Sequence, residues 1–187
     1  MRCTFSVLTQ DSPGVLMRIA GLFYKRNYNI TSLSVSQTND PDISRFTIMI
    51  EADEWGHEQV EKQLAKLVEV IAVENLSSGK FVERRLSLIK VKANLENRPH
   101  ILQIADVFRC RVVDMGSDAL TMEVTGDEGK IKACTEALRP YGILEMAGSG
   151  SVALSRAGFN NGEEYRYGGD IRKIDAGYVM AGNSEAV

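Results

Sequence analysis

The sequence predicts an α+β protein built from two ferredoxin-like units, each with the element order βαββαβ. Two observations support this fold class. Between residues 3 and 76, segments with strand-like alternation and segments with helical spacing follow one another in that order. After a small polar linker at residues 77–80, the same order recurs with weaker patterning to about residue 155. A length of 187 residues suits two small domains of this kind.

The first unit opens with a predicted strand, residues 3–9, in which apolar and hydroxyl side chains alternate. Ser12 is expected to cap a helix whose first position is Pro13. The apolar face of this helix repeats at helical spacing and comprises Val15, Leu16, Ile19, Leu22 and Phe23.

The remaining elements of the first unit are a hairpin, a helix and a last strand. Residues 30–37 and 45–51 are expected to pair around a turn at 39–42. In the first of these strands the predicted apolar face holds Thr31, Leu33 and Val35, and the opposite face holds three serines, Ser32, Ser34 and Ser36. An amphipathic helix at 55–69 and a short strand at 70–76 complete the unit.

The second unit repeats this plan. We expect a strand at 84–93, a helix at 98–110 that begins through Pro99, and two short strands, 111–115 and 119–125, around a tight turn. A helix at 128–138 and an extended stretch at 143–154 follow. The predicted domains are therefore 1–77 and 81–157. Residues 158–187, which hold six glycines and no sustained period, predict a flexible tail, with a docking segment as the alternative.

Composition excludes several functional classes. The net charge is −3, and no segment has the clustered basic residues of a nucleic-acid binder. The apolar runs are shorter than the roughly 20 residues that a membrane helix needs. Three cysteines without a CxxC pair, and no secretory leader, lead us to expect a cytoplasmic protein.

No set of residues predicts a catalytic or metal site. His57 and His100 lack ligand spacing to each other or to the cysteines, so exposed helix positions are the expected explanation. Cys3, Cys110 and Cys134 lie at or beside apolar positions, where cysteine commonly packs as a small hydrophobic residue. Neither a P-loop nor a GxGxxG pattern follows any predicted strand.

The turn between the first strand and the first helix is the candidate binding site. Free amides at a helix start attract carboxylates, so this turn, with Asn29 and Ile30 at the start of the next strand, would suit an amino acid. Asp11 would meet the ammonium group, and Val15, Leu16 and Ile30 would meet the side chain. A favourable helix start with no ligand explains the motif equally well. The residues of this turn are Asp11, Ser12, Pro13, Gly14, Val15 and Leu16.

The turn also carries a family resemblance. The pattern DxPGVL after a first strand resembles the ACT domain, a ferredoxin-like module that binds amino acids. A longer set of segments is similar to the small, regulatory subunits of acetolactate synthase. Those segments are LTQDSPGVLMRIAGLFYKRNYNITSLSV, ISRFTIMI, EQVEKQLAKLVEV, VERRLSLIKV and GSVALSRA, spread over residues 1–156.

The resemblance implies a non-catalytic subunit that stimulates the large catalytic subunit of acetolactate synthase and conveys feedback inhibition by valine or another branched-chain amino acid. It implies a homodimer of ACT domains whose effector site combines the turn of one chain with Asn29 and Ile30 of the other. The second domain would engage the large subunit. Thiamine diphosphate, Mg and FAD would belong to that large subunit, and this chain would bind none of them.

Three residues depart from the family pattern: Asp11 replaces a common Asn, Arg85 a common acidic residue and Cys110 a common Gly. Two other functions stay open at this point. The first is a free-standing amino-acid sensor that acts on another enzyme or a transcription factor, and the second is an independent enzyme on a ferredoxin-like scaffold.

Overall fold

The computed structural model describes residues 2–157, 164–167 and 170–173. The chain forms two compact units. Unit 1 comprises the chain up to Val82 and from Ala153 onward, and unit 2 comprises Glu83–Val152. Strands and helices follow the order βαββαβ twice between Arg2 and Ser155, which confirms the predicted α+β class with two ferredoxin-like units.

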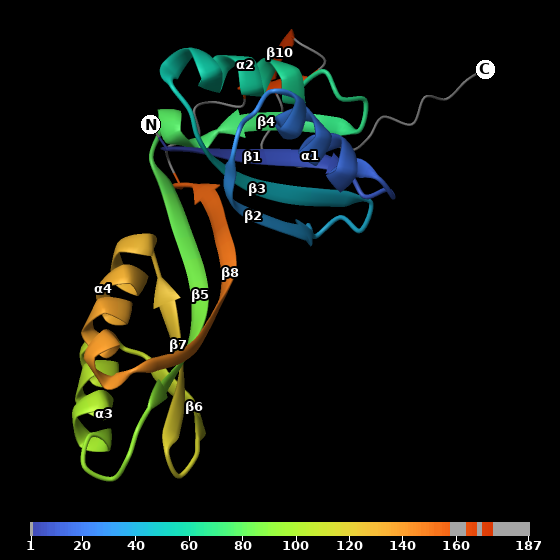
Figure 1. Cartoon of the computed structure of the whole chain (residues 1–187). Coiled ribbons are helices and arrows are strands. Elements are labelled where there is room, and N and C mark those ends of the chain that lie inside the picture. The colour runs from blue at the N-terminus through green and yellow to red at the C-terminus, as the bar shows by residue number, and fades with distance from the viewer. Residues whose placement is uncertain (1, 158–163, 168–169, 174–187) are drawn as a thin grey trace. The chain divides into compact units, whose positions relative to one another are not determined.

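Unit 1 is a four-stranded antiparallel sheet in the order β2-β3-β1-β4, with α1 and α2 on one of its faces (Figure 1). The order follows from the ferredoxin-like plan, because each helix returns the chain across the sheet to a non-adjacent position. The elements are β1 (Arg2–Gln10), α1 (Val15–Lys25), β2 (Ile30–Gln37), β3 (Ile43–Glu51), α2 (Glu54–Leu64) and β4 (Val70–Asn75).

The core of unit 1 lies between the sheet and its two helices. Phe5 and Val7 of β1 are fully buried, and they pack in one cluster with Ile19 and Phe23 of α1 and Ile48 of β3. Each large side chain of this kind contributes about 1.5–3 kcal/mol through removal of apolar surface from water. Burial of this face fixes α1 on the sheet and thereby positions the turn that precedes the helix.

Helix α2 is shorter than predicted. It begins at Glu54, where the Asp53 side chain accepts a hydrogen bond of 2.8 Å from the Gly56 amide, and it ends at Leu64 instead of residue 69. The carbonyl of Glu69 accepts a hydrogen bond of 2.9 Å from the Gln10 amide. The chain must leave the helix before this point to reach the sheet.

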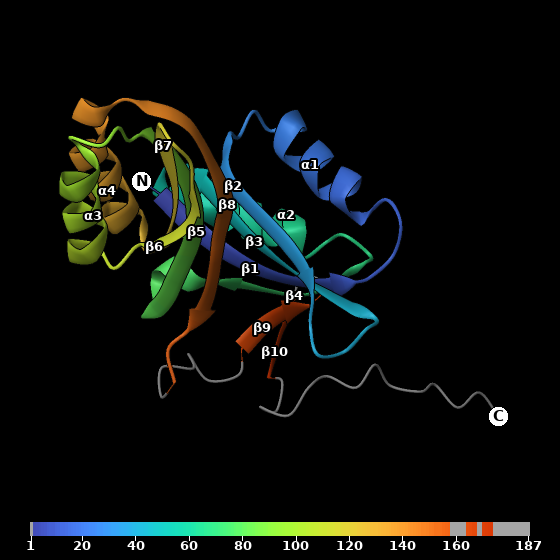
Figure 2. The ribbon, with the colours of Figure 1, turned by 90° about the horizontal axis from the view of Figure 1, so that it is seen from below.

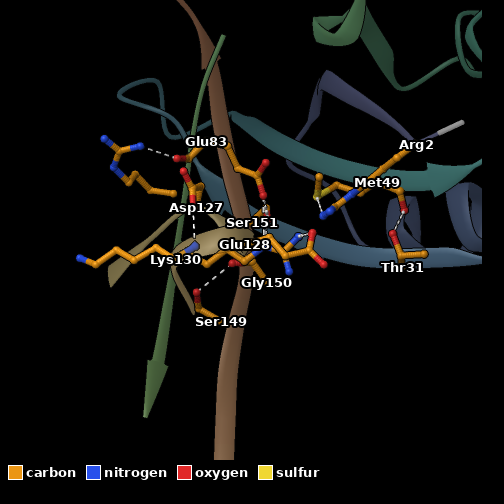
Figure 3. A network of polar contacts seen from close by, with 12 residues as sticks. Arg2, Thr31, Met49, Glu83, Asp127, Glu128, Lys130, Ser149, Gly150 and Ser151 are labelled. Carbon is orange, nitrogen blue, oxygen red and sulfur yellow. Dashed lines mark hydrogen bonds and ion pairs between the residues drawn. The ribbon is translucent and has the colours of Figure 1, made fainter. Parts of the chain in front are cut away.

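Strand β2 contains a bulge that changes which side chains face the core. The register shifts between Ile30, which pairs with Ile50, and Ser32, which pairs with Met49. The Thr31 hydroxyl donates to the Met49 carbonyl at 3.2 Å (Figure 3), and Ile30 and Leu33 both pack on the core. The expectation that Thr31 lies on the apolar face was therefore wrong, because the extra residue rotates Ile30 into that place.

Unit 2 repeats the architecture, with its four strands in the order β6-β7-β5-β8 and both helices on one face of the sheet (Figure 2). Ile89, Leu120 and Met122 of the sheet and Ile101 and Leu138 of the helices are fully buried in one cluster. The elements are β5 (Phe81–Lys92), α3 (Arg98–Val107), β6 (Arg111–Met115), β7 (Ala119–Gly126), α4 (Glu128–Leu138) and β8 (Ile143–Ser155).

A compact polar cluster joins β5, β8 and the start of α4 within unit 2 (Figure 3). The Arg85 guanidinium donates to Glu83 at 3.1 Å, to the Ser151 hydroxyl at 2.5 Å and to Glu128 at 3.3 Å. Ser151, which is fully buried, donates in turn to Glu83 at 2.6 Å. Arg85 thus has a structural role here, in holding neighbouring parts of unit 2 together.

Four short elements complete the description. Leu76–Ser78 and Arg139–Tyr141 are 3₁₀ turns, so the predicted linker at 77–80 begins within a helical turn. Strands β9 (Glu164–Tyr167) and β10 (Asp170–Lys173) pair with each other antiparallel. The rest of the predicted tail, at 158–163, 168–169 and 174–187, lies outside the described residues.

Candidate functional site

The turn between β1 and α1 is led by a glycine in the left-handed conformation. Gly14 has φ of 91° and precedes the first helical residue, Val15. No side chain caps the helix. The predictions that Ser12 caps α1 and that Pro13 is its first residue were therefore wrong, because both residues lie in the turn. The Ser12 carbonyl accepts a hydrogen bond from the Val15 amide at 3.5 Å.

Because no side chain caps α1, several of its first amides remain open. Among the described residues, the amides of Gly14, Leu16 and Met17 donate to no acceptor. The turn from Asp11 to Gly14 is exposed. Open amides at the positive end of a helix dipole bind anions, so the geometry of this turn suits a carboxylate.

Asp11 is anchored within its own unit. One carboxylate oxygen accepts from Gln37 Nε2 at 2.6 Å, and the other accepts from the Ser44 hydroxyl at 3.2 Å. The Asp11 amide donates to the Asp42 carbonyl at 2.7 Å. These contacts tie the turn to the β2–β3 hairpin. The remaining lone pairs of the carboxylate can accept from a cation or another donor.

The two apolar residues of the turn differ in exposure. The Val15 side chain is 5% exposed and belongs to the core of unit 1, whereas Leu16 is 47% exposed. One helical turn further on, Arg18 forms an ion pair with Glu69, and the Arg18 side chain is 59% exposed. Leu16 is therefore the apolar side chain of this turn that a ligand could reach.

Asn29 and Ile30 lie at the other end of the same sheet. Ile30 pairs with Ile50, which pairs with Cys3 at the beginning of β1, whereas the turn follows Gln10 at the end of β1. About seven strand residues, or roughly 23 Å, separate the two ends. The expectation that the turn and the start of β2 line one cleft within a single chain was therefore wrong.

The sequence did not indicate that several other residues lie at or near this turn. Gln37 and Ser44 face each other across the β2–β3 ladder, and that pairing could have placed them next to Asp11. Thr9 is fully buried, and its hydroxyl has no hydrogen-bond partner within the described part of the chain. Thr9 is two positions after Val7 and four after Phe5, so the period of a strand places all three side chains on the same face of β1. This spacing could have predicted that Thr9 is buried.

The other reactive residue types form no recognisable catalytic set. His100 is exposed, as expected, but His57 is 9% exposed and its Nε2 lies 2.9 Å from the Ala52 carbonyl, so that expectation failed for His57. Over the described residues, no three His, Cys, Asp or Glu side chains gather as metal ligands. None of the described helices combines the length and apolar character needed to cross a membrane.

Comparison with known proteins agrees with this architecture. Residues 5–72 match the family described as the AHAS small subunit-like ACT domain, and residues 84–157 match the family described as the small subunit of acetolactate synthase. Unit 1 thus contains an ACT-type domain, a class of regulatory module, and unit 2 supplies most of the segment that matches the small subunit of acetolactate synthase.

Individual relatives cover almost the whole folded chain. A probable acetolactate synthase small subunit of Archaeoglobus fulgidus is 47% identical over 156 residues, which is 83% of this chain and 98% of that protein. The acetolactate synthase small subunit of Mycobacterium bovis is 44% identical and covers 82% of this chain and 91% of its own length. The crystal structure of the Thermotoga maritima small subunit superposes with a TM-score of 0.77 at 35% identity, over 84% of this chain and 98% of that one. The chain belongs to the family of acetolactate synthase small subunits.

Proposed function

We propose that this chain is a non-catalytic subunit that stimulates the large catalytic subunit of acetolactate synthase and makes it sensitive to valine or another branched-chain amino acid. Membership of the small-subunit family supports a regulatory role. The observation that carries the finer proposal is the uncapped start of α1, where the amides of Gly14, Leu16 and Met17 have no acceptor among the described residues.

The chemistry of the turn matches an amino-acid zwitterion. The ligand carboxylate accepts hydrogen bonds from the open amides of α1, where the helix dipole favours negative charge. The ligand ammonium donates to the Asp11 carboxylate, whose two oxygens each accept one hydrogen bond within the described part of the chain, from Gln37 and from Ser44. Leu16 contacts the branched side chain, since it is the exposed apolar residue of the turn.

A second copy of the chain would complete this site. Strand β2 is at the edge of its sheet, and two such edges can pair antiparallel around a twofold axis. That pairing places the start of one β2 against the end of the other. The end of β2 is Gln37, which contacts Asp11, so Asn29 and Ile30 of a second copy would reach the turn.

Helix α1 also presents a surface suited to a twofold contact. Met17 and Tyr24 are 75% and 86% exposed, and residues seven positions apart lie on the same face of a helix. Gly21 lies between them, and a Cβ atom there would meet nothing within 4 Å. Two large apolar side chains that flank a small residue allow close approach of a second helix.

The first test reconstitutes the enzyme. We expect the full chain to raise the rate of acetolactate formation by the large subunit and valine to reverse this effect. Gly14→Asp should abolish valine sensitivity and keep stimulation, because it places a negative charge where the ligand carboxylate binds. Gly14→Asn is the matched control, since it has the same size without the charge and should lose less sensitivity. Failure of the wild-type chain to stimulate would overturn the proposal.

The second test addresses the dimer. Tyr24→Glu should convert the dimer to a monomer in sedimentation experiments, because it buries a charge in the α1 contact. Val68→Glu is the matched control: Val68 is 84% exposed on the same unit but lies outside α1 and β2, so the dimer should persist. Equal effects of the two variants would contradict the proposed interface.

The cofactors and location follow from the same proposal. Thiamine diphosphate, Mg and FAD are assigned to the large subunit, and the complex to the cytoplasm. Capture of this chain from a native extract should retain a thiamine-dependent enzyme with flavin absorbance. Recovery of a different enzyme or a transcription factor instead would favour the free-standing sensor.

A further inference from the structure

Two cysteines that the proposed regulatory function does not use meet in unit 2. The sulfur atoms of Cys110 and Cys134 are 3.5 Å apart, although the residues are separated by 24 positions in the sequence. Both are free thiols. No other pair of the chain's three cysteines is joined by a recorded contact in the described structure.

The local structure brings the two thiols together from different elements. Cys110 follows α3 and immediately precedes β6, and its amide donates to the Ala105 carbonyl at 2.7 Å. The preceding residue, Arg109, has φ of 51°, a left-handed conformation that turns the chain sharply after α3. Cys134 lies on the buried face of α4, with Ile131 and Leu138.

The two thiols differ in accessibility and acidity. Cys134 is fully buried, whereas Cys110 is half-buried. A hydrogen bond with the Cys134 thiol lowers the pKa of Cys110, and the charge of Lys130 acts in the same direction. The same hydrogen bond and burial raise the pKa of Cys134. Cys110 is therefore the sulfur that an oxidant reaches first, because it is half-buried whereas Cys134 is fully buried, and its thiolate is the nucleophile.

We propose that Cys110 and Cys134 form a reversible intramolecular disulfide when the chain is exposed to a peroxide. This inference does not depend on the proposed binding of an amino acid or of a large subunit. A disulfide has a sulfur separation of about 2.05 Å, so the two sulfur atoms must approach by about 1.5 Å. Rotation of the Cys110 side chain, which extends from a turn, can supply this movement.

The reaction balances with hydrogen peroxide as the oxidant. The Cys110 thiolate attacks a peroxide oxygen, the S–O bond forms and the O–O bond breaks, and the hydroxide that leaves takes up a proton to give water. The Cys134 sulfur then attacks the sulfenic sulfur of Cys110, so the S–S bond forms and the S–O bond breaks. The second hydroxide leaves with the Cys134 proton. Two thiols and one peroxide thus give one disulfide and two waters.

Mass spectrometry of the full chain tests the proposal. The reduced chain is treated with hydrogen peroxide, its remaining thiols are alkylated, and it is digested without reductant. We expect one crosslink between the peptides that contain Cys110 and Cys134, an alkylated Cys3 and complete reversal by dithiothreitol. The oxidised chain should also unfold at a temperature at least about 5 °C higher, because the bridge closes a loop in the unfolded state.

Three variants separate this reaction from general oxidation. Cys3→Ser is the matched control and should leave the crosslink unchanged, since Cys3 is buried in the other unit. Cys134→Ala should stop the reaction at a sulfenic acid on Cys110, which dimedone traps. Cys110→Ser should leave Cys134 reduced. Each of three results would overturn the proposal. They are disulfides only between separate chains, alkylation of both Cys110 and Cys134 after peroxide treatment, and a lower unfolding temperature of the oxidised chain.

Discussion

Replacement of Gly14 by alanine tests whether the left-handed turn sets the start of α1. The φ of 91° is open to glycine but costs an L-residue roughly 1–2 kcal/mol. A Cβ atom at Gly14 would meet nothing within 4 Å, so no steric term adds to this conformational cost. The expected loss in free energy of unfolding is therefore about 1–2 kcal/mol for Gly14→Ala. Gly14→Asn should lose less, because asparagine tolerates this conformation better.

Urea unfolding followed by tryptophan fluorescence measures this loss in the unit concerned. The chain has one tryptophan, Trp55, which belongs to α2 of unit 1. A loss of that size lowers the urea midpoint by about 0.5–1 M. If alanine and asparagine were both neutral, the left-handed conformation would not constrain the turn. If alanine cost more than about 3 kcal/mol, a clash would have to exist that the structure does not contain.

Substitutions at four further residues have outcomes that the contacts specify. Arg98→Ala should destabilise unit 2 by about 2 kcal/mol in chemical unfolding followed by circular dichroism, because the guanidinium binds three backbone carbonyls at 2.6–3.0 Å. Arg98→Lys should recover less than half of the lost free energy of unfolding, and full recovery would contradict the role of the planar group. Asp53→Ala should lower the free energy of unfolding of unit 1 by about 1 kcal/mol, because it removes the cap of α2. Asp127→Ala should cost unit 2 a similar amount, because Asp127 caps α4. Circular dichroism measures both losses, and no loss in either variant would refute the capping roles. Asp11→Ala should cost about 1–2 kcal/mol by tryptophan fluorescence through loss of the Gln37 and Ser44 contacts, and an increase in stability would show that the carboxylate strains the turn.

The element order could be predicted because the apolar spacing in this chain is strong where the core is formed. Ile19 and Phe23 repeat at helical spacing, and Phe5 and Val7 alternate along a strand; all four are buried. The residues at which the helices end were less predictable. Helix α2 ends at Leu64 although Leu67 and Val68 continue its apolar pattern, because β1 binds the carbonyl of Glu69.

The candidate site was only partly predictable. The residue types of the turn indicated a helix start that suits a carboxylate, but not which residue begins the helix, because Ser12 and Pro13 have favourable propensities for positions that Gly14 and Val15 occupy. The anchoring of Asp11 by Gln37 depends on strand register, and the contact of Cys110 with Cys134 depends on packing between distant segments. No local pattern encodes either of these.

The division of unit 1 into two stretches of sequence has a consequence for synthesis of the protein. Its last part, from Ala153 onward, follows the whole of unit 2 along the chain. The Ser155 hydroxyl donates to Glu74, and the Arg156 amide donates to the Lys80 carbonyl at 2.9 Å. On the ribosome, unit 1 can close its four-stranded sheet early, but these final contacts must wait until every residue of unit 2 has emerged.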